Sequence, residues 1–182
     1  NMFAVFMFGR LLEQIWGLKR VLTYYFVTGI GAAVIQMIVV GFRIYVVKSG
    51  LSAEAISDVI AQGGQLLNQH MNYTDAAKGA LNILLNTGTI GASGAVFGIL
   101  LAFGMLFPNI PLYIIPFPFP IKAKWLVMGY GAMELILGLA YLPGDNVAHF
   151  AHLGGMVFGI FMILYWKKKD RTKNINNVQY FR

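Results

Sequence analysis

The sequence contains no cysteine, and only 12% of its 182 residues carry a charge. Without cysteine the chain forms no disulfides and performs no thiolate chemistry. Soluble domains are about a quarter charged and half apolar, whereas 58% of this chain is apolar. This composition excludes a disordered protein and argues against a water-soluble enzyme. With three histidines and no HExxH motif, the chain has too few metal ligands, and we predict neither a metal nor another cofactor.

Long apolar stretches take the place of the missing charge. A membrane-spanning helix needs about 20 mostly apolar residues, and three stretches of about that length carry at most one charge: 21–42, 125–142 and 147–166. Residues 91–107 form a fourth, shorter stretch. Residues 1–9 are apolar but too short to cross, so we interpret them as the second half of a span and the chain as a fragment of a longer protein. The predicted fold is an all-α polytopic membrane helix bundle with about four complete spans plus the second half of one.

The basic residues are distributed unevenly around these spans. The chain has 14 Lys and Arg against 7 Asp and Glu, a net charge of +7. Eleven of the 14 fall on one side of the predicted membrane: Arg10, Lys19, Arg20, Lys122, Lys124, Lys167, Lys168, Lys169, Arg171, Lys173 and Arg182. The positive-inside rule makes this side, with the C-terminus, cytoplasmic. Because these residues follow helix ends, we predict a lipid bilayer as partner and no nucleic acid.

The external segment between the first two complete spans, residues 43–90, is long for a loop. Its stretches 53–62 and 76–86 have apolar residues at helical spacing, which predicts two helices in the membrane interface. Gly63 and Gly64 predict a break between them.

A proline-rich segment separates the short fourth stretch from the next span. Residues 108–120 hold five prolines, which exclude a regular helix and predict an inner-leaflet turn. The chain thus divides into a membrane core over 1–166, which includes the enlarged external segment 43–90, and a basic cytoplasmic tail over 167–182.

Polar groups inside a bilayer are costly and mark function by default, and one of them is Ser93. It begins a helix too short to reach the external surface, so we expect it to lie below that surface. Gly91 and Gly94 let backbones approach closely, and the free N–H groups of a helix N-terminus suit a developing oxyanion. The alternative interpretation is a small-residue packing face.

His152 precedes a Gly-x-x-x-Gly pair, Gly155 and Gly159, that admits a neighbouring helix closely. In the predicted topology Ser93 and His152 lie at similar depth, and histidine suits the role of the base that activates serine. Phe97, four residues after the serine, would stack on the imidazole and orient it. The alternative for His152 is a satisfied interhelical hydrogen bond.

Two acids are candidates for a third member of this group. Glu134 lies within a span and Asp145 in the loop before the last one, but no spacing connects either with His152. A Ser–His dyad is the simpler interpretation, with Glu134 as an interhelical hydrogen-bond donor. His149, one turn nearer the surface, is interpreted as a rim or substrate-contact residue.

Together these residues resemble the rhomboid family of intramembrane serine proteases. The resemblance rests on two motifs about 60 residues apart and on the opening of the chain: Gly91-x-Ser93-Gly94-Ala95, Ala151-His152-x-x-Gly155-x-x-x-Gly159, and Gly9-Arg10-Leu11-Leu12-Glu13. It implies a six-helix core, lacking here its first helix, in the bacterial inner membrane.

The resemblance also implies residue roles. Ser93 would attack a peptide bond of a transmembrane protein substrate, and His152 would act as base and then as acid. Asn1 matches the asparagine of the family's His-x-x-x-Asn pair, so Asn1 and the Ser93 backbone N–H would hold the oxyanion. The histidine of that pair would lie outside this chain, which predicts an impaired fragment.

Two other functions are compatible with the sequence. One is a catalytically silent rhomboid-like protein that binds membrane clients. The other is a small polytopic transporter or channel, in which the histidines and Glu134 line a polar path.

Overall fold

The computed structural model consists almost entirely of helices. It describes residues 1–88, 91–113, 119–140 and 148–179, with the side chains of the last helix described as far as Arg171. The chain divides into two compact parts, residues 1–35 with 91–182 and residues 36–90.

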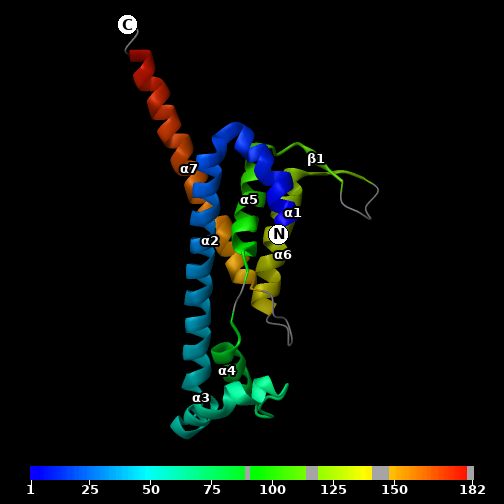
Figure 1. Ribbon diagram of the computed structural model, residues 1–182, viewed down its shortest axis with the longest axis vertical. Coiled ribbons are helices and arrows are strands. Elements are labelled where there is room, and N and C mark those ends of the chain that lie inside the picture. Colours follow the sequence, from blue (N-terminus) through cyan, green and yellow to red (C-terminus); the bar gives the residue numbers. More distant parts are fainter. Residues whose placement is uncertain (89–90, 114–118, 141–147, 180–182) are drawn as a thin grey trace. The chain divides into compact units, whose positions relative to one another are not determined.

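The N-terminal segment is continuous with the helix that follows it. Helix α1 (Met2–Ala4) passes through a π-helical turn, η1 (Val5–Gly9), into α2 (Arg10–Ser49). At Gly17 the backbone leaves the helix, with φ 74° and ψ 159°, a conformation that glycine adopts without a steric penalty. Figure 1 shows the chain running in opposite directions on the two sides of this region. The predicted loop between the first two spans is therefore largely helical, because Leu12 and Trp16, one turn apart, pack into the core.

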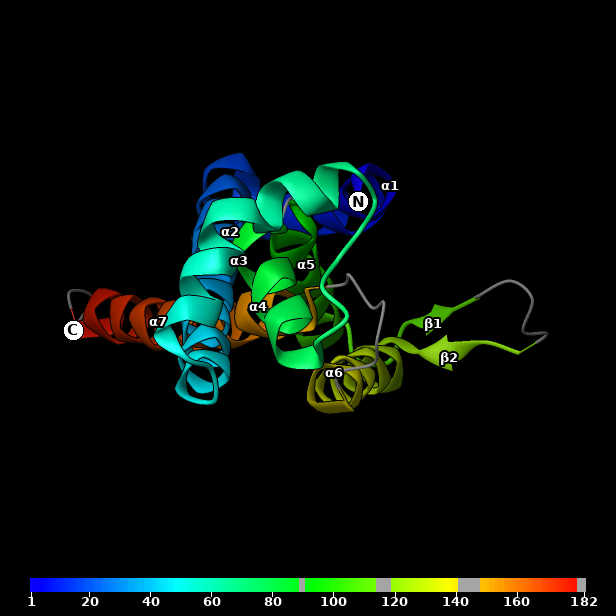
Figure 2. The same ribbon diagram turned by 90° about the horizontal axis from the view of Figure 1, so that it is seen from below.

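Helix α5 (Ser93–Leu106) forms the centre of the first part. Nine of its 14 residues are buried, and both views show it enclosed by α1, α6 and α7 (Figures 1 and 2). The main apolar cluster joins α5 to the N-terminal segment and the last helix: Phe8, Leu12, Tyr24, Ile99, Ala102, Phe103, Ala123 and Ile163. A short helix that is apolar on all sides is stable here because other helices surround it.

The proline-rich segment forms no regular helix, as expected. Strands β1 (Pro111–Leu112) and β2 (Ile121–Lys122) pair antiparallel, with Pro111 opposite Lys122 and Leu112 opposite Ile121. This short hairpin leads directly into α6 (Ala123–Ala140).

The last helix, α7, runs over His149–Gln179, so it continues into the predicted tail. An ion pair supports the first turn beyond the apolar stretch. The two terminal nitrogens of the Arg20 guanidinium, Nη1 and Nη2, donate hydrogen bonds to the Asp170 carboxylate at 2.8 and 2.7 Å. Beside this pair, the rings of Trp16 and Trp166 meet edge to face with centroids 5.1 Å apart.

By length and apolar composition, three helical stretches of the described residues are able to cross a membrane: Met2–Ser49, Ala123–Ala140 and His149–Arg171. Helix α5 is apolar but shorter. Many large apolar side chains of these helices are exposed, such as Phe26, Ile136 and Phe161. Exposed apolar surface of this extent is what a lipid-facing bundle requires.

The second part contains α3 (Ala53–Asn68) and α4 (Ala76–Asn86). The prediction of a break at Gly63-Gly64 is wrong, because α3 passes through both glycines. A Cβ on Gly63 would overlap the side chain of Asn82, so the glycine permits close packing of α3 on α4. Lys78 also donates a hydrogen bond to Asp58 at 3.0 Å, which joins the two helices.

Candidate functional site

Ser93 is the first residue of α5, and a glycine with an unusual backbone conformation, Gly91, precedes it. Gly91 has φ 152°, a value that other residues rarely adopt. Among the described residues, a Cβ on Gly91 would contact Ser93 alone, at 3.6 Å from its Oγ. Gly91 therefore shapes the turn into the helix, and its role in helix packing stays a prediction.

The two sequence motifs meet where α5 crosses α7. A Cβ on Gly155 would overlap the carbonyl oxygen of Gly94 and lie 2.7 Å from its carbonyl carbon. A Cβ on Gly94 would lie 3.0 Å from the carbonyl oxygen of Ala151. The two backbones are thus in direct contact. One turn after Gly155, a Cβ on Gly159 would lie 3.0 Å from Leu101 of α5.

This crossing places Ser93 beside His152. The Oγ of Ser93 lies 2.8 Å from the Nε2 of His152, within hydrogen-bond distance. Phe97, one turn after the serine, stacks on the imidazole with ring centroids 4.1 Å apart and an interplanar angle of 8°. Tyr130 of α6 meets the Phe97 ring edge to face, with centroids 6.2 Å apart. Tyr130 is a neighbour of the site that the sequence analysis did not identify.

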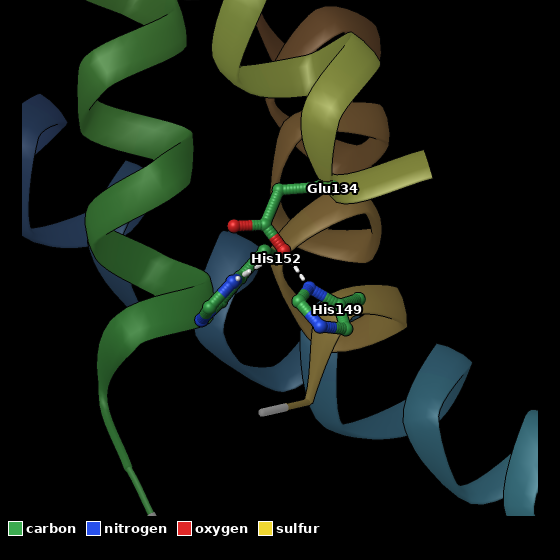
Figure 3. A group of neighbouring side chains, drawn as sticks. All are labelled: Glu134, His149 and His152. Carbon is green, nitrogen blue, oxygen red and sulfur yellow. Dashed lines mark hydrogen bonds and ion pairs between the residues drawn. The ribbon is translucent and has the colours of Figure 1, made fainter. Parts of the chain in front are cut away.

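A buried carboxylate occupies the other side of the imidazole. Glu134 of α6 is 5% exposed, and His149 and His152 are 7% and 8% exposed. The Oε2 of Glu134 is 2.6 Å from the Nδ1 of His149 in a hydrogen bond and 3.0 Å from the Nδ1 of His152. The second contact has ion-pair distance but not hydrogen-bond alignment. Figure 3 shows the carboxylate pointing between the two rings.

The spacing of residues in the sequence therefore did not predict the contact between Glu134 and His152. It connected neither acid with His152, whereas the structure places Glu134 at the ring nitrogen opposite Ser93. His149 was interpreted from the sequence as a rim or substrate-contact residue, and in the structure its side chain is buried against Glu134. Asp145, the other acid considered, lies outside the described residues.

The same three side chains are of types that bind metals. Two ligands of one zinc ion lie about 3.3 Å apart, because bonds of about 2.0 Å meet at tetrahedral angles. The Oε2–Nδ1 distances of 2.6 and 3.0 Å are shorter. They are the distances of groups that interact with each other directly. Chemically, the arrangement suits proton transfer, with a hydroxyl at one nitrogen of an imidazole and a carboxylate at the other.

Asn1, the predicted oxyanion residue, is exposed at the start of the chain. Its backbone oxygen accepts a hydrogen bond from Val5, and its side chain caps no helix. Among the described residues, Asn1 and Ser93 share no hydrogen bond. Its role towards a bound substrate stays a prediction.

Comparison with known proteins gives one family and one relative. The family model described as the Rhomboid domain matches residues 1–169. A stretch of 90 residues, 46% of the chain, is 33% identical to an uncharacterized rhomboid protein of Schizosaccharomyces pombe that is named as mitochondrial. That stretch covers 23% of the relative's length. No solved structure matches the chain.

Proposed function

Because the chain belongs to the rhomboid family, whose members are generally intramembrane serine proteases, we propose that it is a serine endopeptidase that cleaves transmembrane protein substrates. The observation that supports this proposal is the 2.8 Å contact between the Ser93 hydroxyl and the His152 imidazole. A serine hydroxyl is a weak nucleophile until a neighbouring base accepts its proton. The stacked Phe97 ring holds the imidazole in the plane that faces the serine.

In the proposed reaction, the Ser93 Oγ attacks the carbonyl carbon of the substrate while its proton moves to Nε2 of His152. The carbonyl oxygen becomes an oxyanion, which accepts hydrogen bonds from the Ser93 backbone N–H and from the Asn1 side chain. The imidazolium then gives its proton to the leaving amine, and an acyl-enzyme remains. Water, deprotonated by His152, hydrolyses the acyl-enzyme and restores the serine.

We also propose an orientation for the protein in its membrane. The basic end, which includes Arg20 and Lys167–Lys169, would face the cytoplasm of a bacterial inner membrane under the positive-inside rule. The similar Schizosaccharomyces pombe protein is named as mitochondrial, so a mitochondrial membrane is the second candidate. Protease protection of a C-terminal tag in sealed vesicles tests the orientation.

The function is tested with a fluorophosphonate probe and a model transmembrane substrate. We expect the full protein, reconstituted in liposomes, to be labelled and to cleave the substrate, and Ser93→Ala to do neither. Substrate binding without labelling or cleavage would instead indicate a catalytically silent rhomboid. Cleavage that persists in Ser93→Ala would exclude the assigned nucleophile.

A further inference from the structure

The proposed reaction leaves the buried carboxyl group of Glu134 without a role. Glu134 lies in a helix able to span the membrane and is 5% exposed. Ionisable groups in such a position are costly, and they are retained where partners compensate for the lost solvation. Here the partners are two imidazoles, and one of them is the proposed base.

The three side chains come from two helices, Glu134 from α6 and the two histidines from α7. His149 and His152 are three residues apart on α7, so they project from the same side of that helix. A single oxygen of Glu134, on α6, approaches the Nδ1 atoms of both. The Nε2 of His152 remains directed at Ser93.

We propose that Glu134 is a positioning residue for His152 and that His149 holds the carboxylate in place; this inference rests on the proposed protease function. An ionised carboxylate only accepts hydrogen bonds. It therefore favours the tautomer of His152 that carries hydrogen on Nδ1. In that tautomer the lone pair is on Nε2, where the Ser93 hydroxyl lies.

The carboxylate also acts on the charge that forms during the reaction. When the Ser93 proton reaches Nε2, the ring becomes an imidazolium whose Nδ1–H faces the Glu134 carboxylate at 3.0 Å. An opposite charge at this distance, away from water, stabilises that state. The present misalignment of the Nδ1 contact is compatible with this role, because catalytic hydrogen bonds often tighten only when substrate is bound.

The test compares Glu134→Gln with Glu134→Asp in the full protein. Glutamine has nearly the same shape, but its amide N–H can face Nδ1 and favour the wrong tautomer, whereas aspartate keeps the charge. We expect Glu134→Gln to lower kcat by about 10²–10⁴-fold with KM changed by less than about two-fold. Glu134→Asp should restore at least about ten-fold of that loss, and fluorophosphonate labelling of Ser93 should follow kcat.

Glu54→Gln is the matched control, because it makes the same substitution at an exposed glutamate of α3 that belongs to no motif of the site. It should leave kcat unchanged. Thermal unfolding in detergent shows whether each variant is folded. If Glu134→Gln does not fold, His149→Asn provides the second variant. It should lower kcat without raising KM, because the carboxylate would lose its second partner.

Several results would overturn the inference. Wild-type kcat in Glu134→Gln would do so, as would equal losses in the Gln and Asp variants, which indicate packing rather than charge. Loss of wild-type activity in a chelator would assign the three side chains to a metal instead. Failure of the proposed function is recognised separately, because wild-type protein would then show no activity that depends on Ser93.

Discussion

The contact between Gly94 and Gly155 determines how closely α5 and α7 approach. We therefore expect a side chain added at Gly155 to separate the two helices by an amount that can be worked out from the structure. In Gly155→Ala the added Cβ would lie 2.7 Å from the carbonyl carbon of Gly94 and nearer still to its oxygen. Ordinary van der Waals contact begins at 3.4 Å. The carbon contact alone therefore requires an opening of about 0.7 Å, and the closer oxygen contact requires an opening of more than about 1 Å. No flexible side chain is available to absorb the change, since both groups are backbone.

The serine and the histidine are attached directly to these two helices. Ser93 adjoins Gly94, and His152 is one turn before Gly155. An opening of about 1 Å would lengthen their 2.8 Å contact to about 3.8 Å, which is beyond a hydrogen bond. Misplacement of reacting groups by 1 Å reduces the rate by about 10²-fold. Overpacking of this kind also lowers the free energy of unfolding by about 1–3 kcal/mol.

The assay measures Ser93 labelling, substrate cleavage and thermal unfolding of the same preparations. Gly129→Ala is the control, because a Cβ at Gly129 of α6 meets nothing within 4 Å. We expect Gly129→Ala to match the wild type in all three measurements, and Gly155→Ala to lose most activity while it remains folded. A Gly155→Ala protein that labels and cleaves at the wild-type rate would refute the argument that this backbone contact aligns the dyad.

Three further predictions follow from single contacts. Phe97→Leu should lower kcat by about ten-fold through loss of the stacked ring, whereas Phe97→Tyr should retain activity in the cleavage assay. The buried Tyr24 hydroxyl donates to the carbonyl of Gly98 at 2.9 Å, so Tyr24→Phe should reduce the free energy of unfolding by about 1 kcal/mol, measured in detergent. The hydrogen bond with Asp58 raises the pKa of Lys78 above the ordinary lysine value of 10.5. The stability that this pair contributes to α3 and α4 is thus complete below that value and is lost as the pH rises through the raised pKa. An alkaline titration followed by circular dichroism should show this loss in the wild type and not in Lys78→Met.

The sequence predicts the helical membrane fold well, since the length and apolar character of helices such as α6 and α7 follow from composition alone. Local conformations that depend on packing are predicted less well. Gly63 suggested a break because glycine destabilises an isolated helix. In the structure its missing side chain is what allows α3 to approach Asn82 of α4. Similarly, the turn near the N-terminus depends on the positive φ of Gly17. The residues around Gly17 in the sequence do not indicate this conformation.

The residues of the candidate site divide in the same way. Ser93, Phe97 and His152 were found because each belongs to a local pattern, a helix start or a helix face, and the structure brings the three together. Tyr130 and Glu134 belong to no such pattern. Their position depends on how α6 is rotated and shifted against its neighbours, and no periodicity along the chain records that.

Glu134 shows why spacing was misleading at this site. It lies six residues before the end of α6 at Ala140, or about 9 Å along the helix axis, whereas His149 is the first residue of α7. If α6 ended and α7 began at the same level, the Glu134 carboxylate would lie a turn or more too deep to reach the His149 imidazole. The 2.6 Å contact therefore requires that α7 begin well below the end of α6, and Figure 1 shows α6 extending past the starts of α5 and α7. Because α5 and α7 both begin below the end of α6, the Ser93 hydroxyl, the His152 imidazole and the Glu134 carboxylate lie at one level. This level is about 9 Å inside the end of α6. In the proposed protease, the peptide bond to be cleaved would have to reach this level of the helix bundle.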